Sequence, residues 1–235
     1  MKTTKKALLF TFCAVLLVVA SVLGTMAYLT SSETVTNTFT VGNVKITLDE
    51  AKVNLDGTYV TNKDDRTEDG NKYHLLPGHE YHKDPTVTVE AGSEESYVRM
   101  IVKINKQAAL DEIFKSQGGA SLNEIFLGYN PADWVLVKET VSGDVRSYEF
   151  RYKNTVAASN EEDNVKLEAL FEKIKVPGKI TKEQLATIAD LKIDVEAHAI
   201  QADGFQSKDG KTAEQVAWEA FDQQVNNSQG ATENH

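Results

Sequence analysis

The stretch YVRMIVKI, at residues 97–104, decides the fold class because its side chains alternate between two faces of an extended chain. One of the two faces is apolar throughout: Val98, Met100, Val102 and Ile104. A period of two residues is typical of a β-strand that lies on a core. The alternation recurs at 193–199, and residues 134–138 and 148–152 flank the turn sequence Ser142-Gly143-Asp144. The chain is therefore expected to be mainly β, with antiparallel hairpins.

Helical patterns lie between these strands instead of alternating regularly with them, which disfavours a parallel sheet. The sequence predicts an antiparallel, jelly-roll-like β-sandwich with inserted α-helices at about 105–130, 160–190 and 212–225. We expect a single domain over residues 28–226, followed by a disordered tail at 227–235.

The helix predictions depend on capping boxes and on one apolar face. In each box a Ser or Thr is followed three residues later by Glu or Gln: Ser121 with Glu124, Thr181 with Gln184, and Thr212 with Gln215. Within 160–175, four apolar residues share one face at helical spacing: Leu167, Leu170, Phe171 and Ile174. The box at Thr212 begins a predicted helix that directs Ala217, Ala220 and Phe221 inward, with Trp218 as a further candidate for that face.

The first 27 residues have the order of a secretory signal peptide. Three lysines within residues 2–6 precede an apolar run over 7–23, and small residues follow up to Ala27. We expect cleavage between Ala27 and Tyr28, which makes the protein secreted and leaves no stable membrane anchor. The alternative is that the apolar run remains as an N-terminal anchor, although a spanning helix needs roughly 20 such residues.

Charge and cysteine content narrow the range of functions. The full chain has a formal charge of −10, and loss of the three lysines of the signal peptide makes the mature part −13. Nucleic-acid binding requires a cationic surface, so this class of function is excluded. The chain has one cysteine, Cys13, which leaves with the signal peptide, so the mature protein has no disulfide, thiolate nucleophile or Cys-bound metal.

One short string invites a zinc interpretation. His79-Glu80-Tyr81-His82 places its two histidines three residues apart, whereas the helical zinc-peptidase pattern needs four. Residues 79 and 82 of an extended segment also point to opposite faces. His79, Glu80 and His82 are therefore only weak metal candidates, and we predict no catalytic residue, no cofactor and no bound metal.

Two further polar groups have an ordinary interpretation. The acidic loop contains Asp64, Asp65, Glu68 and Asp69, and a loose calcium site is the alternative to a solvated loop there. It departs from the EF-hand pattern at Thr67 and Leu76. His198 shares a strand face with Asp194 and Glu196, which indicates a polar outer face rather than a ligand set.

The segment that follows the expected cleavage point is rich in threonine and valine. Over 34–41, threonines alternate with a second set of residues: Val35, Asn37, Phe39 and Val41. Thr and Val favour extended structure, so the segment is predicted to be a strand. A strand with a free end can complete the sheet of a neighbouring copy. The alternative is that it pairs within its own domain.

Three separated segments resemble the TasA/camelysin family of secreted Gram-positive proteins, which depend on a SipW-type signal peptidase. They are LGTMAYLTSSETVTNTFTVGNVKITLDE, LLPGHEYHKDPTVTVEAGSEESYVRMIVKI and KIDVEAHAIQADGFQ, and they cover about a third of the chain. Residues 105–180 show no such resemblance. The resemblance implies a jelly roll with helical insertions, export by that peptidase, and self-association into fibres of a biofilm matrix or cell surface.

The resulting functional hypothesis is a secreted structural subunit that assembles through its N-terminal strand. Some members of the family carry a metallopeptidase label, so a zinc metalloendopeptidase is one alternative. This chain lacks the zinc motif, and we therefore predict that it is not an enzyme. The other alternative is a monomeric surface-exposed module that binds a glycan or a host protein.

Overall fold

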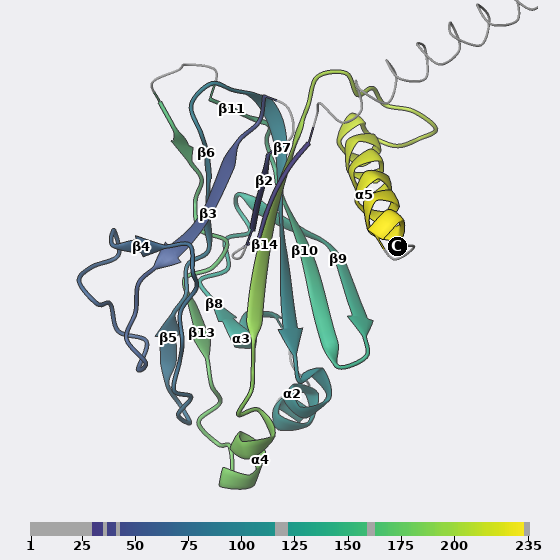
Figure 1. Ribbon diagram of the computed structural model, residues 1–235. Coiled ribbons are helices and arrows are strands. Elements are labelled where there is room, and N and C mark those ends of the chain that lie inside the picture. Colours follow the sequence, from purple (N-terminus) through teal and green to yellow (C-terminus); the bar gives the residue numbers. More distant parts are fainter. Residues whose placement is uncertain (1–29, 35–36, 41–42, 116–121, 159–162, 233–235) are drawn as a thin grey trace, which may run out of the picture.

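The fold is built from three antiparallel sheets and four helices in the part of the chain that the structure describes (Figure 1). The structure is a computed structural model, and it describes residues 30–34, 37–40, 43–115, 122–158 and 163–232. Several predicted features lie outside these residues: the signal peptide, the cleavage pair Ala27 and Tyr28, Val35, Val41, and Ser121 of one capping box. No helix within the described ranges is long and apolar enough to cross a membrane.

The largest sheet has seven strands in the order β2-β1-β14-β7-β10-β9, with β11 paired to β7. Its strands are β1 (Thr30–Thr34), β2 (Asn37–Thr40), β7 (Ser93–Asn105), β9 (Trp134–Ser142), β10 (Val145–Tyr152), β11 (Val156–Ala158) and β14 (Ile193–Gln201). All of its pairs are antiparallel. The predicted strands at 97–104 and 193–199 and the hairpin over 134–152 are thereby confirmed.

Two smaller sheets lie on one side of this large sheet (Figure 1). The first has the order β12-β6-β3-β4, with strands β3 (Ile46–Ala51), β4 (Arg66–Thr67), β6 (Thr86–Val89) and β12 (Val165–Lys166). The second has the order β5-β13-β8, with strands β5 (Glu80–His82), β8 (Phe126–Leu127) and β13 (Lys173–Lys175). The mainly β, antiparallel architecture with few helices is confirmed, and its layers form a β-sandwich. Jelly-roll connectivity stays a prediction.

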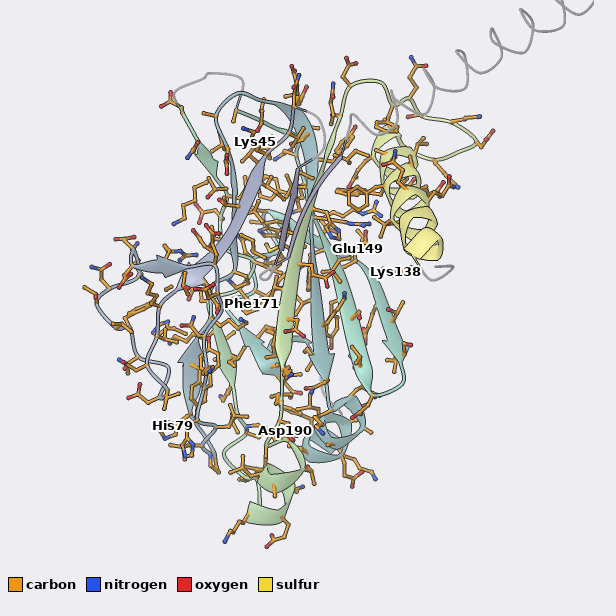
Figure 2. All side chains as sticks on the ribbon, in the orientation of Figure 1. Lys45, His79, Lys138, Glu149, Phe171 and Asp190 are labelled. Atoms are coloured by element: carbon orange, nitrogen blue, oxygen red, sulfur yellow. The ribbon has the colours of Figure 1, made fainter. Side chains whose placement is uncertain are left out.

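The main core fills the space between the layers. The apolar faces of β7 and β10 contribute Met100, Val102 and Phe150, and the smaller sheets contribute Leu48 and Val87 opposite them. Figure 2 shows Phe171 inside this space. A second, small group of buried residues lies apart from it, under the C-terminal helix. We call this group the outer cluster: Ile200, Ala217, Trp218 and Phe221.

The helices are α2 (Gln107–Phe114), α3 (Leu122–Ile125), α4 (Lys182–Thr187) and α5 (Ala213–Thr232). Both described capping boxes have the expected pair of hydrogen bonds, at Thr181 with Gln184 and at Thr212 with Gln215. The helix expected over 160–175 was wrong, because residues 163–175 contain the short strands β12 and β13 instead. Its four apolar residues are nevertheless buried in the main core. Ile174 lies in β13, and the backbone N–H groups of Leu167 and Leu170 donate to the carbonyls of Val87 and Pro85.

Two boundaries near the chain ends are also corrected. The strand expected over 34–41 is instead an antiparallel hairpin, in which Thr34 pairs with Asn37. The expected disordered tail is wrong over 227–232, because α5 continues to Thr232. Once a capped helix has begun, each further residue adds a hydrogen bond, and the sequence has no proline there to stop it.

Candidate functional site

The edge of β14 is covered by the N-terminal hairpin of the same chain. Strand β1 pairs with β14 from Thr30 opposite Ile200 to Thr34 opposite Glu196. Strand β2 is the outermost strand of the sheet and pairs only with β1 in the described sheet, with Phe39 opposite Ser32. Asn37 and Phe39 of the predicted assembly strand therefore lie in β2, one strand removed from the rest of the sandwich.

The attachment of this hairpin depends on the backbone. Strand β1 reads Thr-Ser-Ser-Glu-Thr and has no large apolar residue. Burial of apolar area, which stabilises the other strands, therefore contributes little to its pairing with β14. The ladder hydrogen bonds remain, and each has a net value of roughly 0.5–1.5 kcal/mol. The hairpin thus forms an edge of the sheet, and β14 would present an unpaired edge without it.

Helix α5 covers the outer face of the same sheet through one buried cation. The Arg99 side chain on β7 is 3% exposed, and its guanidinium lies 4.4 Å from the ring centre of Trp218 and 4.9 Å from that of Phe221. It also reaches Asp222 at 2.6 Å and Glu149 at 3.7 Å. Figure 2 shows Glu149 on the side of the sheet that faces α5. Arg99 therefore joins the helix to the sheet.

His198 on β14 belongs to this contact. Arg99 Nε donates a hydrogen bond to His198 Nδ1 at 3.1 Å, and the imidazole packs on Phe221 with ring centres 4.9 Å apart. Burial, and next the positive charge of Arg99, lower the pKa of His198 to about 3. Its two expected neighbours on the strand face are engaged elsewhere or exposed, since Glu196 pairs with Lys103 and Asp194 faces solvent. These three residues do not form a ligand set.

The structure does not bring the weak zinc candidates together. Glu80 pairs with Lys173 at 3.3 Å, and the ring of His82 stacks on Tyr59 with centres 4.1 Å apart. His79 is exposed at the end of the molecule distant from Glu149 (Figure 2). Among the residues that the structure describes, no group of three or more His, Cys, Asp or Glu side chains is arranged to hold a metal ion.

The acidic residues of this loop likewise contact different neighbours. Asp65 forms an ion pair with Lys52 at 2.8 Å, and the backbone N–H of Asp64 donates to the side chain of Asn62. Strand β4 interrupts the loop at Arg66, whose guanidinium pairs with Asp49 at 2.7 Å. The carboxylates therefore do not converge on one point.

Two clusters were missed by sequence reasoning. One is the Arg99 contact, for which the only sequence signal was a pair of aromatic residues three apart in the predicted C-terminal helix. The other is a buried ion pair of Lys83 with Glu50, 2.7 Å apart, which also contacts Asn71. Lys83 and Asn71 line a cavity of about 340 Å³. No sequence motif marked this second cluster.

Comparison of the chain with protein-family models, with curated proteins and with solved structures finds no match.

Proposed function

We propose that this protein is a secreted structural subunit of an extracellular matrix or cell-surface fibre, and that copies assemble by exchanging the N-terminal hairpin. The observation that carries the proposal is the position of the β1–β2 hairpin: it forms an edge of the large sheet near the expected new N-terminus, and β1 has no large apolar residue. Export by a SipW-type signal peptidase, with cleavage between Ala27 and Tyr28, would free this end. The resemblance to the TasA/camelysin family supports the same role.

The physical argument rests on the equivalence of the two pairings. A hairpin that leaves its own β14 exposes a row of unpaired N–H and C=O groups on residues 196–200. The hairpin of another copy can restore every one of these bonds with the same sequence and register. Where each copy donates its hairpin to a different neighbour and the rotation does not close, the exchange produces a fibre, whereas reciprocal exchange between two copies gives a dimer.

A disulfide lock tests the exchange directly. Ser31 and Ala199 face each other in the β1–β14 register, and the mature chain has no other cysteine. We expect the oxidised double variant Ser31→Cys/Ala199→Cys to remain monomeric in electron microscopy and sedimentation. The same variant under reducing conditions is the matched control, and it should form fibres like the wild type. Equal fibre formation in both states would contradict assembly by strand exchange.

Mixing the two single variants distinguishes exchange from stacking of intact monomers. If the hairpin is donated, oxidation of fibres made from Ser31→Cys and Ala199→Cys chains should give disulfide-linked dimers on a non-reducing gel. A wild-type mature protein that forms no fibre at high concentration, at low pH or after seeding would refute the structural role itself and favour the monomeric binding module.

The proposal includes the absence of peptidase activity. It is supported by the separation of His79 and His82, which have different neighbours. The purified mature protein should bind no stoichiometric zinc by elemental analysis, and the double variant His79→Ala/His82→Ala should leave assembly unchanged. Loss of bound metal together with loss of peptide cleavage in that variant would establish the zinc-peptidase alternative.

A further inference from the structure

Three side chains that carry reactive groups meet beside the end of β3. Glu50 and Lys83 are 5% and 7% exposed, and Lys83 Nζ lies 2.7 Å from Glu50 Oε2. Asn71 Nδ2 donates a hydrogen bond of 2.9 Å to the other oxygen, Glu50 Oε1. A single buried carboxylate therefore bridges a primary amine and a carboxamide.

The carboxamide of Asn71 is held in one orientation. Its Oδ1 accepts from the backbone N–H of Val53 at 3.0 Å, while Nδ2 donates to the carbonyl of Ala51 at 2.8 Å as well as to Glu50. Reversing the amide would place donor against donor and acceptor against acceptor. The carbonyl oxygen is thus polarised by an N–H group, and the amide nitrogen lies beside the carboxylate.

The ion pair has apolar neighbours and room for movement. Leu48, Pro85 and Val195 line a small void beside Glu50 and Lys83, so the ion pair has apolar neighbours. Transfer of the ammonium proton to the carboxylate gives a neutral amine and a neutral acid, which avoids two buried charges. The cavity of about 340 Å³ is lined by both Lys83 and Asn71, and it gives the flexible lysine side chain space to approach the amide.

We propose that Lys83 and Asn71 join in an intramolecular isopeptide bond, with Glu50 as the proton carrier. Glu50 takes a proton from the Lys83 ammonium, and the free electron pair of Nζ then attacks Cγ of Asn71. The Val53 N–H stabilises the negative charge that develops on Oδ1. Glu50 delivers its proton to Nδ2 and accepts the second excess proton from Nζ. The Cγ–Nδ2 bond breaks, and the products are the new amide, one ammonia molecule and protonated Glu50.

This bond would be independent of the proposed assembly, because it lies within one chain and joins residues that take no part in the β1–β14 pairing. It would close a covalent loop over residues 71–83 and tie the segment before β5 to the segment that follows it. Tension or proteolysis within 72–82 would then leave the two flanking segments connected.

Intact-mass spectrometry of the purified mature protein tests the proposal. We expect a mass lower than the sequence mass by one ammonia molecule, and a tryptic digest in which peptides 67–72 and 73–99 are joined, with no cleavage after Lys83. A full sequence mass with the three separate peptides 67–72, 73–83 and 84–99 would overturn the proposal. Ammonia loss with unjoined peptides would also overturn it, since that result indicates a succinimide at Asn71.

Variants of the three residues assign their roles. Lys83→Arg keeps the charge but cannot form the amide, and Glu50→Gln keeps the shape but cannot carry the proton, so both should show the full mass. Lys173→Arg is the matched control and should still lose ammonia. Asn71→Asp serves as a further test that does not depend on how well the other variants fold: here the loss should change from one ammonia to one water. Unchanged ammonia loss in Asn71→Asp would refute the assignment of Asn71.

Discussion

The main core and the outer cluster stabilise two parts of the molecule by different means. The main core joins three sheets through apolar and aromatic contacts, for example between Phe126 and Phe171, whose ring centres are 4.4 Å apart. The outer cluster has four buried residues, and its centre is the cation of Arg99 between two aromatic rings. Apolar burial is insensitive to pH, whereas a contact that includes His198 depends on the protonation of that imidazole. The sandwich and helix α5 should therefore lose their structure under different conditions.

Removal of one core ring should have the largest effect. Phe126 is 2% exposed and also packs edge-on against Tyr148, so Phe126→Ala leaves a cavity between the layers. We expect the free energy of unfolding to fall by about 3–5 kcal/mol. Chemical denaturation measures it, with Val141→Ala on an exposed position of β9 as the control that changes little. A loss of structure in Phe126→Ala that is limited to α5 would contradict the expectation, because it would show that the main core and the outer cluster are coupled.

Replacement of the buried cation should have a smaller and local effect. Arg99→Met keeps the volume of the side chain but removes both ring contacts and the ion pair with Asp222. We expect a cost of about 2 kcal/mol for the packing of α5. Hydrogen exchange should accelerate in 213–225 and remain slow in β7. Lys103→Met is the matched control, because that cation lies on the same strand and pairs with Glu196 of β14 instead of with α5. Equal acceleration across the large sheet would contradict a local role.

Acid should separate the two clusters without any mutation. The pKa of His198 is lowered to about 3 in the folded protein, so below its ordinary value of 6.5 the unfolded or detached state binds one more proton. The contribution of neutral His198 to the stability of the α5 contact is fully present above pH 6.5. As the pH falls from there toward 3, this contribution decreases by about 1.4 kcal/mol per pH unit.

Fluorescence of Trp218 in a Trp134→Phe background measures this loss. The emission should shift to longer wavelength between about pH 6 and pH 4, while circular dichroism of the sheets stays constant. His198→Asn should flatten the transition, and His79→Asn, at an exposed position, should leave it unchanged. A transition that persists in His198→Asn would assign the pH dependence to another group.

The strands with a period of two and the glycine-containing turns could be predicted from the sequence, because residues close together in the chain determine them. The turn at Ser142-Gly143-Asp144 is one case: it joins β9 to β10, and Gly143 has φ of +59°, a conformation that favours glycine. The helix prediction for residues 163–175 failed because apolar residues spaced three and four apart also occur in irregular segments that neighbouring elements bury. The prediction of one strand over 34–41 failed for a different reason. Alternation of side chains does not reveal that Thr34 and Asn37 belong to two paired strands.

The clusters around Arg99 and around Glu50 could not be predicted from the sequence, because each is assembled from segments that are distant in the chain. Arg99 and Asp222 are separated by 123 residues, and Glu50 and Lys83 by 33. None of these pairs has a motif with fixed spacing. By contrast, the weak zinc and calcium candidates were close in sequence but have separate partners in the fold.

The register of β1 on β14 determines how the molecule responds to a pulling force. Thr30, where the N-terminal strand begins, lies opposite Ile200, just before β14 leads toward α5. Both ends of the chain therefore leave from the same end of this antiparallel ladder. A force between them would break its hydrogen bonds one after another, from Ile200 to Glu196, as a zipper opens. Once α5 has detached, this geometry makes the β1–β14 pair the first to open under such a force, while β7 remains paired with β14.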